Sequence, residues 1–318
     1  MGFKREPQIF PTNINTLTFG CDKKTRLGGE NILPFYTFDT GTKGDIQVEY
    51  RPKIGVVISD MGYMKNIPGI AAYYQGAHTV AEMAKRAAAM PGADFMVLSL
   101  DSAHPNNGGR PVDECIVLVK EVIDTIDVPI AVEGSKHIEI DNKLLEEVAY
   151  ATQGKNILIL SAREENYKSI ATAAALAYDQ NITAESSVDI NLAKQLNILI
   201  SGLGVKPEKM VMNPGSAAAG YGFDYVASTI ERVKLAALAH NDIMLNMPII
   251  TPVYSEAWMV KESVASQEDY PEWGSLEQRG VNMEIATAAA CLAAGSNAVI
   301  LCHPDSIGTI SGLIDSLM

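Results

Sequence analysis

The feature that most constrains the fold of this chain is a pattern that repeats eight times from residue 54 onward. In each repeat, a short apolar run precedes a longer segment whose apolar residues recur at helical spacing. Such runs are typical of buried parallel strands, and the longer segments are typical of amphipathic helices. We expect strands at residues 54–59, 94–100, 128–134, 156–162, 182–187, 209–215, 247–254 and 298–304. We expect the helices at residues 79–90, 112–126, 140–152, 167–180, 189–204, 223–240, 276–295 and 306–318.

Eight consecutive βα units favour closure into a (β/α)8 barrel, or TIM barrel. The strands begin roughly 25 to 50 residues apart, and such barrels commonly occupy about 250 residues. A chain of 318 residues therefore has room for one barrel and an extension. An open doubly wound sheet is the alternative, but the first strand is not followed by the GxGxxG turn of dinucleotide-binding sheets. We predict an α/β fold with the barrel over residues 54–318.

Residues 1–53 do not follow the repeat. Two stretches, residues 14–20 and 32–39, alternate between apolar and polar side chains as strands do, and the polar sequence CDKKTRLGGE separates them. This pattern predicts an N-terminal arm of β-hairpins. The arm either caps the bottom of the barrel or packs on another subunit, and we favour the capping hairpin.

The charge of the chain narrows the class of partner. The net charge is −13 and the isoelectric point is about 4.9, so phosphate backbones and anionic lipid surfaces are repelled. Hydrophobic residues make up 47% of the chain and charged residues 20%, which is enough apolar material for a large core. We therefore expect an uncharged ligand or a protein partner, and neither nucleic acid nor a membrane.

The sequence predicts a cytoplasmic protein with ordinary thiols. It begins MGFKREPQIF, without an apolar run of signal-peptide length, and no later segment is apolar for about 18 residues. The four cysteines, Cys21, Cys115, Cys291 and Cys302, form no CxxC pair. They lack the clustering that zinc or an iron–sulfur cluster requires, so we interpret them as buried thiols.

The ends of the predicted strands carry the candidate site, because the segments after the strands build the functional face of such barrels. These positions are rich in hydroxyl, amide and glycine residues, which suit hydrogen bonding to a large neutral ligand better than clamping a phosphate. They are Ser59, Asp60, Asp101, His104, Glu133, Ser135, Ser161, Arg163, Ser186, Ser187, Asn213, Gly215, Ser216, Tyr254, Glu256 and His303.

Conventional catalytic patterns are sparse. A Schiff-base aldolase would have to use Lys136, just after the third strand. A metal hydrolase would need Asp60, Asp101, Glu133 and Glu256 to share a metal with His104 or His303, but no HExxH-like spacing joins them. We interpret His78, His137 and His240, which lie in or beside helices, as structural. We therefore predict no catalytic residues and no metal ligands.

Two loops have backbone features that suit a ligand. The glycine-rich stretch MNPGSAAAGYG (212–222) would let the backbone approach a bulky flat molecule, or it is simply a tight turn. The stretch HPDSIGT (303–309) places backbone N–H groups where many barrels bind phosphate. Asp305 argues against an anion there, and we expect it to be the N-cap of the last helix.

Five stretches resemble one known family, the small subunit of the corrinoid iron–sulfur protein, which is the delta subunit of the CO dehydrogenase/acetyl-CoA synthase system. The resemblance covers nearly the whole chain, and the last three stretches are long and unusual. They are LGGENILPFY (27–36), LSLDSAHPN (98–106), MNPGSAAAGYGFDYVASTIERVKLAAL (212–238), EDYPEWGSLEQRGVNMEIATA (268–288) and AVILCHPDSI (298–307).

The resemblance implies a barrel paired with a larger subunit that carries a [4Fe–4S] cluster and a cobamide-binding domain. A cobamide, a vitamin B12-type corrinoid, would lie between that domain and the top of this barrel, and no iron–sulfur cluster would lie in this chain. The chain lacks the cobalamin motif DxHxxG, since Asp101 and His104 occur in DSAHPNNG. Such a complex carries methyl groups from a methyltetrahydrofolate methyltransferase to acetyl-CoA synthase, and both enzymes are transient partners.

Rim position and the resemblance together give the predicted cofactor-binding residues. The main alternative is a free-standing barrel methyltransferase of the pterin-binding kind, which would bind methyltetrahydrofolate in its own barrel. The residues expected near the cobamide are Asp101, His104, Ser161, Arg163, Asn213, Gly215, Ser216 and His303.

Overall fold

The computed structural model describes residues 8–33 and 50–317, and its centre is a sheet of eight parallel strands. The strand order is β10-β9-β8-β7-β6-β5-β12-β11, so strands that follow one another in the chain are neighbours in the sheet. The strands are β5 (Lys53–Ser59), β6 (Phe95–Ser99), β7 (Ile130–Glu133), β8 (Leu158–Ala162), β9 (Asn181–Glu185), β10 (Met210–Asn213), β11 (Ile250–Pro252) and β12 (Ala298–Leu301).

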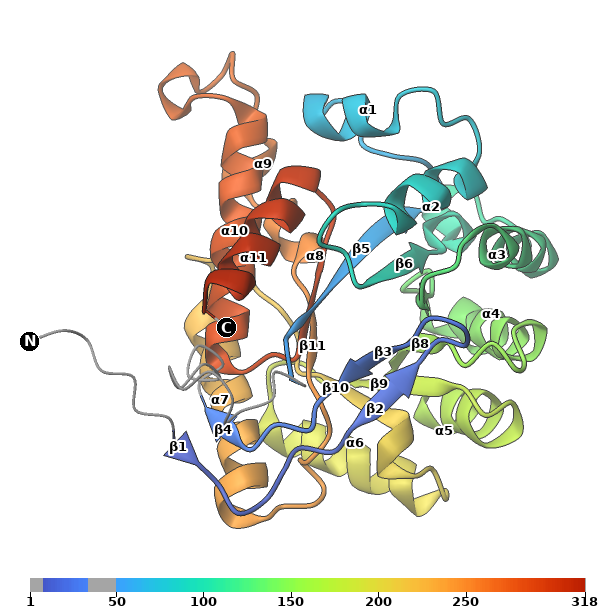
Figure 1. The fold of residues 1–318 in the computed structure, drawn as a ribbon. Coiled ribbons are helices and arrows are strands. Elements are labelled where there is room, and N and C mark those ends of the chain that lie inside the picture. The colour runs from blue at the N-terminus through green and yellow to red at the C-terminus, as the bar shows by residue number, and fades with distance from the viewer. Residues whose placement is uncertain (1–7, 34–49, 318) are drawn as a thin grey trace, which may run out of the picture.

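The sheet closes on itself between its two outer strands, β10 and β11. A parallel bridge joins Met212 to Ile249, and the amide of Met212 donates to the carbonyl of Pro248 at 2.8 Å. Helices surround the ring on its outside (Figure 1). The predicted (β/α)8 barrel is therefore confirmed, and the open sheet is wrong.

Helices connect the strands, and all eight expected helical segments contain helix. Residues 171–177, within the fourth expected helical segment, form a π-helix. Three short helices in the loops were not expected: α1 (Pro68–Tyr74), α8 (Tyr254–Ala257) and α9 (Lys261–Val264). The remaining helices are α2 (Val80–Ala88), α3 (Val112–Thr125), α4 (Ile138–Ala151), α5 (Tyr167–Ile170), α6 (Ile190–Gly202), α7 (Phe223–His240), α10 (Leu276–Ala294) and α11 (Pro304–Leu317). No helix of the described segments combines the length and apolar character needed to cross a bilayer.

The N-terminal arm contains a hairpin, but its strands differ from the expected ones. β2 (Leu17–Phe19) pairs antiparallel with β3 (Thr25–Leu27), which lies inside the stretch interpreted as a polar separator. The separator reading was wrong because Thr25 and Leu27 are buried, although charged residues surround them. β4 (Ile32–Leu33) pairs instead with β1 (Gln8–Ile9), and residues 34–39 of the second expected strand lie outside the described residues.

The hairpin β2–β3 covers the end of the barrel where the strands begin. The amide of Gly20 donates to the carbonyl of Asn156 at 2.7 Å, just before β8, and Thr25 Oγ1 donates to the carbonyl of Asp94 at 2.9 Å, just before β6. The ring of Phe19 packs edge-on against that of Phe95, with 5.4 Å between centroids. The structure thus shows the capping role that we favoured for the arm. The division of the chain into an arm over residues 1–53 and a barrel over residues 54–318 stays a prediction.

A buried ion pair joins the arm to α7 and to the start of β12. Lys234 Nζ contacts Glu30 Oε1 and lies 2.6 Å from Asn297 Oδ1, and Asn297 Nδ2 donates to the same Glu30 oxygen at 2.7 Å. The exposed fractions of the two charged side chains are 0% for Lys234 and 3% for Glu30. This closed polar network holds the arm against the bottom of the barrel.

Candidate functional site

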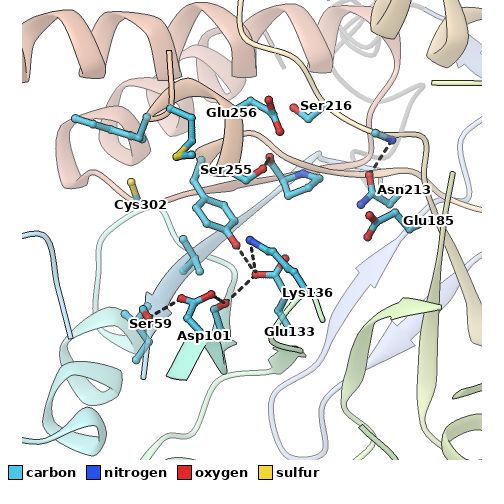
Figure 2. A pocket seen from close by; sticks show the side chains of 18 of the residues that line it. Ser59, Asp101, Glu133, Lys136, Glu185, Asn213, Ser216, Ser255, Glu256 and Cys302 are labelled. Atoms are coloured by element: carbon cyan, nitrogen blue, oxygen red, sulfur yellow. Dashed lines mark hydrogen bonds and ion pairs between the residues drawn. The ribbon is translucent and has the colours of Figure 1, made fainter. Parts of the chain in front are cut away.

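A cavity of about 700 Å³ opens at the end of the barrel where the strands finish, opposite the capping hairpin (Figure 2). Its two sides differ in character, and we name them the polar lobe and the apolar lobe. The polar lobe follows β8, β9 and β10 and is lined by Arg163, Glu185, Ser186, Asn213, Gly215 and Ser216. The apolar lobe follows β5 and β11 and is lined by Tyr63, Met64, Ile70, Tyr74, Trp258 and Met259.

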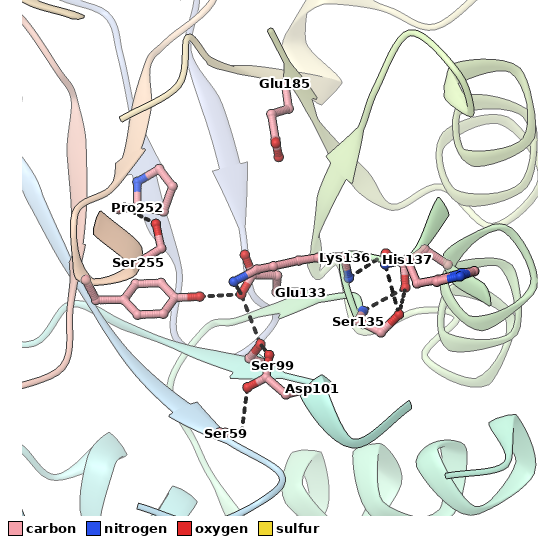
Figure 3. Close-up of polar contacts among 12 residues, drawn as sticks. Ser59, Ser99, Asp101, Glu133, Ser135, Lys136, His137, Glu185, Pro252 and Ser255 are labelled. Carbon is pink, nitrogen blue, oxygen red and sulfur yellow. Dashed lines mark hydrogen bonds and ion pairs between the residues drawn. The ribbon is translucent and has the colours of Figure 1, made fainter. Parts of the chain in front are cut away.

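Between the lobes lies a group of hydrogen-bonded side chains that we call the acid cluster: Ser59, Ser99, Asp101, Glu133 and Tyr254. Ser59 Oγ donates to Asp101 Oδ2 at 2.6 Å, and the Tyr254 hydroxyl donates to Glu133 Oε2. Ser99 Oγ lies between the two carboxyl groups, 2.9 Å from Asp101 Oδ1 and 3.0 Å from Glu133 Oε2. Ser59, Ser99 and Glu133 end the strands β5, β6 and β7, Asp101 follows β6, and Tyr254 begins α8. Figure 3 shows Ser59, Ser99, Asp101 and Glu133 lying close together.

Burial shifts the pKa of two members of the acid cluster, Glu133 and Tyr254. It raises the pKa of Glu133, because an ionised carboxylate loses its hydration there, while Lys136 and the hydroxyls of Tyr254 and Ser99 oppose the rise. Burial also raises the pKa of Tyr254, and the neighbouring Glu133 carboxyl adds to that shift. Tyr254 therefore remains a proton donor, and Glu133 holds its proton to a higher pH than an exposed glutamate.

Lys136 enters the cavity from a loop that Asp141 organises. The Asp141 carboxylate accepts from Ser135 N at 2.7 Å, Ser135 Oγ at 2.7 Å and Lys136 N at 2.9 Å, and Lys136 has a φ of +70°. Its Nζ lies 3.7 Å from Glu133 Oε2 and 5.5 Å from the centre of the Tyr254 ring. The ammonium is thus paired with the acid cluster.

The polar lobe offers hydrogen-bonding groups to a ligand. Asn213 Oδ1 accepts from Gly215 N at 3.1 Å, and this fixes the start of the glycine-rich loop. Gly215 has a φ of +91°, and a Cβ there would lie 2.9 Å from Val188 Cγ2. The hydroxyls of Ser186 and Ser216 are buried and have no hydrogen-bond partner among the residues that the structure describes. A ligand with amide groups can satisfy both hydroxyls.

Charge on the rim of the polar lobe is neutralised by an ion pair. Arg163 Nη2 lies 2.8 Å from Glu185 Oε1, and Arg163 Nε donates to the same oxygen at 2.9 Å. Because this guanidinium is already engaged, the lobe presents mainly neutral hydroxyl and amide groups. This agrees with the expectation of a neutral rim.

Five of the eight predicted cofactor-binding residues line the cavity, and three do not. Ser161 lies below the rim in a small hollow next to Arg163. His104 faces away, and its Nδ1 accepts from Asn106 N at 3.1 Å. His303 is 1% exposed and lies behind the cavity wall, with Nε2 3.1 Å from Glu277 Oε1. The five residues that line the cavity are Asp101, Arg163, Asn213, Gly215 and Ser216.

The position after β12, where many barrels bind phosphate, is filled by the protein itself. Glu284, a fully buried residue of α10, accepts from Cys302 N at 2.8 Å and from His303 N at 3.3 Å. His303 Nδ1 accepts from Asp305 N at 3.1 Å, so His303 provides the cap of α11 and the prediction that Asp305 is the N-cap was wrong. These amides are therefore not available to a bound anion.

The four carboxylates considered for a metal hydrolase do not all meet, because only Asp101 and Glu133 belong to the acid cluster. Asp60 is buried behind the cavity, where it accepts from Ser102 N at 2.9 Å and contacts Arg110 at 3.3 Å. Within residues 8–33 and 50–317, no three side chains of His, Cys, Asp or Glu are arranged to hold a metal ion.

Comparison with known proteins decides the family. A family model described as CO dehydrogenase/acetyl-CoA synthase delta subunit matches residues 17–287. The chain belongs to this family. Subunit delta 2 of the acetyl-CoA decarbonylase/synthase complex of Methanosarcina acetivorans is 31% identical over 93% of this chain, and the delta subunit of Archaeoglobus fulgidus is 30% identical over 99% of it. The alignments cover 66% and 71% of those relatives, so the chain spans somewhat less than two thirds of the Methanosarcina protein.

Solved structures similar to this delta-subunit chain share its fold at low sequence identity. A dihydropteroate synthase from Xanthomonas albilineans in complex with 7,8-dihydropteroate has a TM-score of 0.52 at 14% identity, covering 86% of this chain and 97% of the synthase. The enzyme from Thermus thermophilus has a TM-score of 0.51 at 14% identity, covering 86% and 96%. These likenesses support the barrel fold.

The family-like stretches of this delta-subunit chain lie at both ends of the barrel. Glu30, in the first stretch, forms the buried ion pair with Lys234 at the bottom. Asp101, in the second, belongs to the acid cluster, and residues 212–222 form the loop of the polar lobe. The resemblance seen in the sequence thus comprises both structural and cavity-lining residues.

Proposed function

We propose that this chain is the small subunit of a corrinoid iron–sulfur protein and that its barrel mouth covers one face of a cobamide held mainly by a larger subunit. The observation that carries this proposal is the polar lobe, where the buried hydroxyls of Ser186 and Ser216 lack partners among the described residues. The amide arms of a corrin supply hydrogen-bond donors and acceptors for such groups. Membership of a family of acetyl-CoA synthase subunits supports the same role.

The size of the cavity fits a shared cofactor. Cavities of about 300–1,000 Å³ enclose drug-sized ligands, and a cobamide is considerably larger. A cavity of about 700 Å³ therefore accepts the arms or one edge of a corrin and leaves the remainder to another chain. This is the reason to expect a stable partner at the barrel mouth, and we propose the larger subunit with its [4Fe–4S] cluster and cobamide domain.

In this role the chain binds, orients and shields the cofactor. A bound cobamide supplies the cobalt that carries the methyl group. Asn213 and Ser216 would hold amide arms, Gly215 would allow close approach of the backbone, and Arg163 would border the arms from β8. Ser161, His104 and His303 would act only through these residues, because they lie outside the cavity lining.

Transient exchange of partners follows from the same arrangement. A methyltetrahydrofolate methyltransferase and acetyl-CoA synthase would each have to reach the cobalt that this barrel covers, so the cobamide domain must move relative to the barrel mouth. We propose that the complex works in the cytoplasm and that this chain is its non-catalytic part.

Cobalt retention tests the proposal. The chain is co-purified anaerobically with the larger subunit and cobamide, and cobalt is measured for each heterodimer. Gly215→Leu should reduce cobalt content at least tenfold, because its side chain would fill the approach to the corrin. Gly154→Leu is the matched control, since Gly154 also has a positive φ, of +81°, but lies away from the cavity in open space. Unchanged cobalt in Gly215→Leu contradicts the proposal.

The acid cluster favours a second candidate, the free-standing methyltransferase. Two carboxyl groups inside a barrel can hold a pterin ring and supply a proton, and a protein with a similar fold was solved with 7,8-dihydropteroate. Methyl transfer from methyltetrahydrofolate to free cob(I)alamin, measured with the isolated chain, distinguishes the two. Turnover by the chain alone supports the enzyme, and turnover only after a separate methyltransferase is added supports the carrier.

A further inference from the structure

We propose that a ledge beside the barrel mouth is a docking surface for a transient protein partner, whose own contact surface is basic around an apolar side chain. The ledge comprises residues 259–279, which include α9, the short 3₁₀ helix η6 (Pro271–Trp273) and the first turn of α10. Figure 1 shows α9 and the chain next to it, in orange, at the edge of the molecule. The covering of a cobamide uses the polar lobe instead, and only the transient nature of the partner rests on the proposed function.

The ledge borders a hollow of about 510 Å³ on the outside of the barrel. Met283 and Ala286 of α10 line it together with Ala219 of the glycine-rich loop, and the ledge adds Glu262 and Trp273. Cavities of about 300–1,000 Å³ enclose drug-sized molecules, so this hollow has room for a large apolar side chain of another protein.

The surface next to the hollow carries exposed apolar side chains. Val264 on α9 and Met259 just before it are 54% and 76% exposed. Tyr221, whose hydroxyl donates to Glu262 of the hollow, is 49% exposed. Met259 also lines the apolar lobe, whereas Val264 and Tyr221 do not line the cavity of the mouth. Exposed apolar side chains that gather beside polar ones are typical of protein contact sites.

The two cations of the ledge are engaged by the ledge itself. Lys261 Nζ lies 4.5 Å from the centre of the Tyr270 ring and 5.4 Å from that of the Trp273 ring, and the two rings stack at 4.2 Å. Arg279 Nη1 donates to the carbonyl of Gly274 at 2.9 Å, where η6 ends. These contacts hold the ledge in one conformation, so a partner would meet a preformed surface.

The charge of the ledge is negative, with five carboxylates against two cations. The Tyr221 hydroxyl lowers the pKa of the Glu262 carboxyl, which is therefore ionised. Glu268, Asp269 and Glu272 are exposed, and none of them has an ion-pair partner among the residues that the structure describes. Lysine or arginine on a partner would be attracted here, whereas a second copy of this chain, with a net charge of −13, would be repelled.

The small apolar area of the ledge favours a transient partner over a stable one. Permanent interfaces are larger and more hydrophobic, whereas here one hollow and a few apolar side chains are bordered by carboxylates. Charges of this kind raise the rate of association, and salt screens them. The partner is therefore a protein that arrives and leaves, as the methyltransferase and acetyl-CoA synthase do in the proposed function.

Binding of the full chain to each of these two enzymes, measured by biolayer interferometry at low and at high salt, tests the charged part of the surface. The triple variant Glu268→Gln, Asp269→Asn, Glu272→Gln should weaken the binding of at least one enzyme about tenfold at low salt. At high salt the triple variant and the parent should bind alike, because the attraction is screened in both.

The hollow is tested by a second pair of variants. Ala286→Phe fills the hollow from its exposed position on α10 and should weaken the same enzyme about tenfold at low and at high salt, because an apolar contact is not screened. Ala286→Ser leaves the hollow open and should bind as the parent does.

Controls separate the ledge from general charge and from the cobamide proposal. Glu121→Gln, Asp124→Asn, Glu146→Gln removes the same charge from exposed positions on α3 and α4 and should leave binding unchanged. Circular dichroism and thermal unfolding confirm that each variant is folded. The binding assay needs no cobamide, and the ledge variants should retain cobalt in the heterodimer, so the two proposals fail independently.

Three outcomes would overturn the inference. The parent chain binds neither enzyme, or the triple variant and Ala286→Phe bind both enzymes as the parent does. The third is a loss of heterodimer formation in the ledge variants, because the ledge would then belong to the stable interface with the larger subunit.

Discussion

The barrel contains two glutamate–lysine pairs at opposite ends, and they differ in almost every respect. At the bottom, Glu30 and Lys234 are 3% and 0% exposed and share Asn297 in a closed network. At the top, Glu133 and Lys136 are 15% and 41% exposed, lie 3.7 Å apart and border an open cavity. The same two residue types thus form a buried contact at the bottom of the barrel and a solvent-accessible contact at the top.

This difference agrees with the separate roles of the two ends of such barrels. The face where strands begin serves stability, and the face where strands end carries the site. A fully buried pair cannot lose one partner without leaving a charge in a medium of low polarity. A partly exposed pair can lose a partner to water or to a ligand, so it can take part in binding. Each of the following experiments perturbs one end and compares it with the other.

The largest effect is expected from Lys234→Met. It leaves the Glu30 carboxylate buried without its cation, and the loss of one partner of a buried pair typically costs about 3–5 kcal/mol. Urea unfolding should show this loss, while cobalt retention per folded heterodimer stays normal. Adding Glu30→Leu should recover most of the lost free energy of unfolding. A single variant as stable as the parent would show that the pair contributes nothing at the bottom.

A second effect at the bottom is expected from Gly28→Ala. Gly28 has a φ of +76°, and a Cβ there would lie 2.0 Å from the carbonyl oxygen of Asn15. Strained backbone of this kind costs about 1–3 kcal/mol, so the free energy of unfolding should fall by that amount. Gly62→Ala, at the top, has a φ of +109° and open space around it, and should cost less. Equal losses in the two variants would mean that backbone strain alone, and not the tight packing of the arm, sets the cost.

The pH dependence of stability should differ between the parent and Glu133→Gln. Because the folded-state pKa of Glu133 is raised, the native protein binds more protons than the unfolded chain above the ordinary glutamate range. The contribution of Glu133 to stability is therefore present at low pH and is lost as the pH rises through the folded-state pKa. Glu133→Gln should gain stability relative to the parent between pH 5 and pH 8. A constant difference across that range would contradict the raised pKa.

The smallest effect on stability is expected from Lys136→Met. The ammonium is 41% exposed and lies 3.7 Å from Glu133, and exposed pairs contribute about 0–1 kcal/mol. The free energy of unfolding should change by less than about 1 kcal/mol, well below the loss in Lys234→Met. A loss comparable with that of Lys234→Met would remove the distinction between the two ends.

The sequence predicted the barrel because its signal is long and regular. Even β9, whose sequence has a single large aliphatic side chain in Ile182, was located, since its neighbours in the repeat left only one place for it. The short helices were missed because seven residues in α1 and four in α8 are too few to show a period. The apolar lobe depends on them: α1 contributes Ile70 and Tyr74, and Trp258 follows α8.

The sequence predicted those site residues whose position at a strand end fixes the direction of the side chain. It was wrong for residues whose side chain can turn away from the cavity. Asn213 ends β10, Gly215 lies two residues later, and both line the cavity, as expected. His303 follows β12 in the same way, but Glu277 and the amide of Asp305 hold its ring behind the wall. Ser99 was read as part of a buried strand, although its hydroxyl joins the two carboxyl groups of the acid cluster. Contacts between distant segments decide such cases.

Hydrogen–deuterium exchange on the heterodimer, with and without cobamide, tests the central claim most directly. If the barrel mouth covers the cofactor, amides of residues 186–188 and 213–222 should exchange more slowly when cobamide is bound. Amides of the capping hairpin, residues 17–27, should be unaffected. Protection of the hairpin with an unchanged mouth would contradict the account, because the cofactor would then lie at the other end of the barrel.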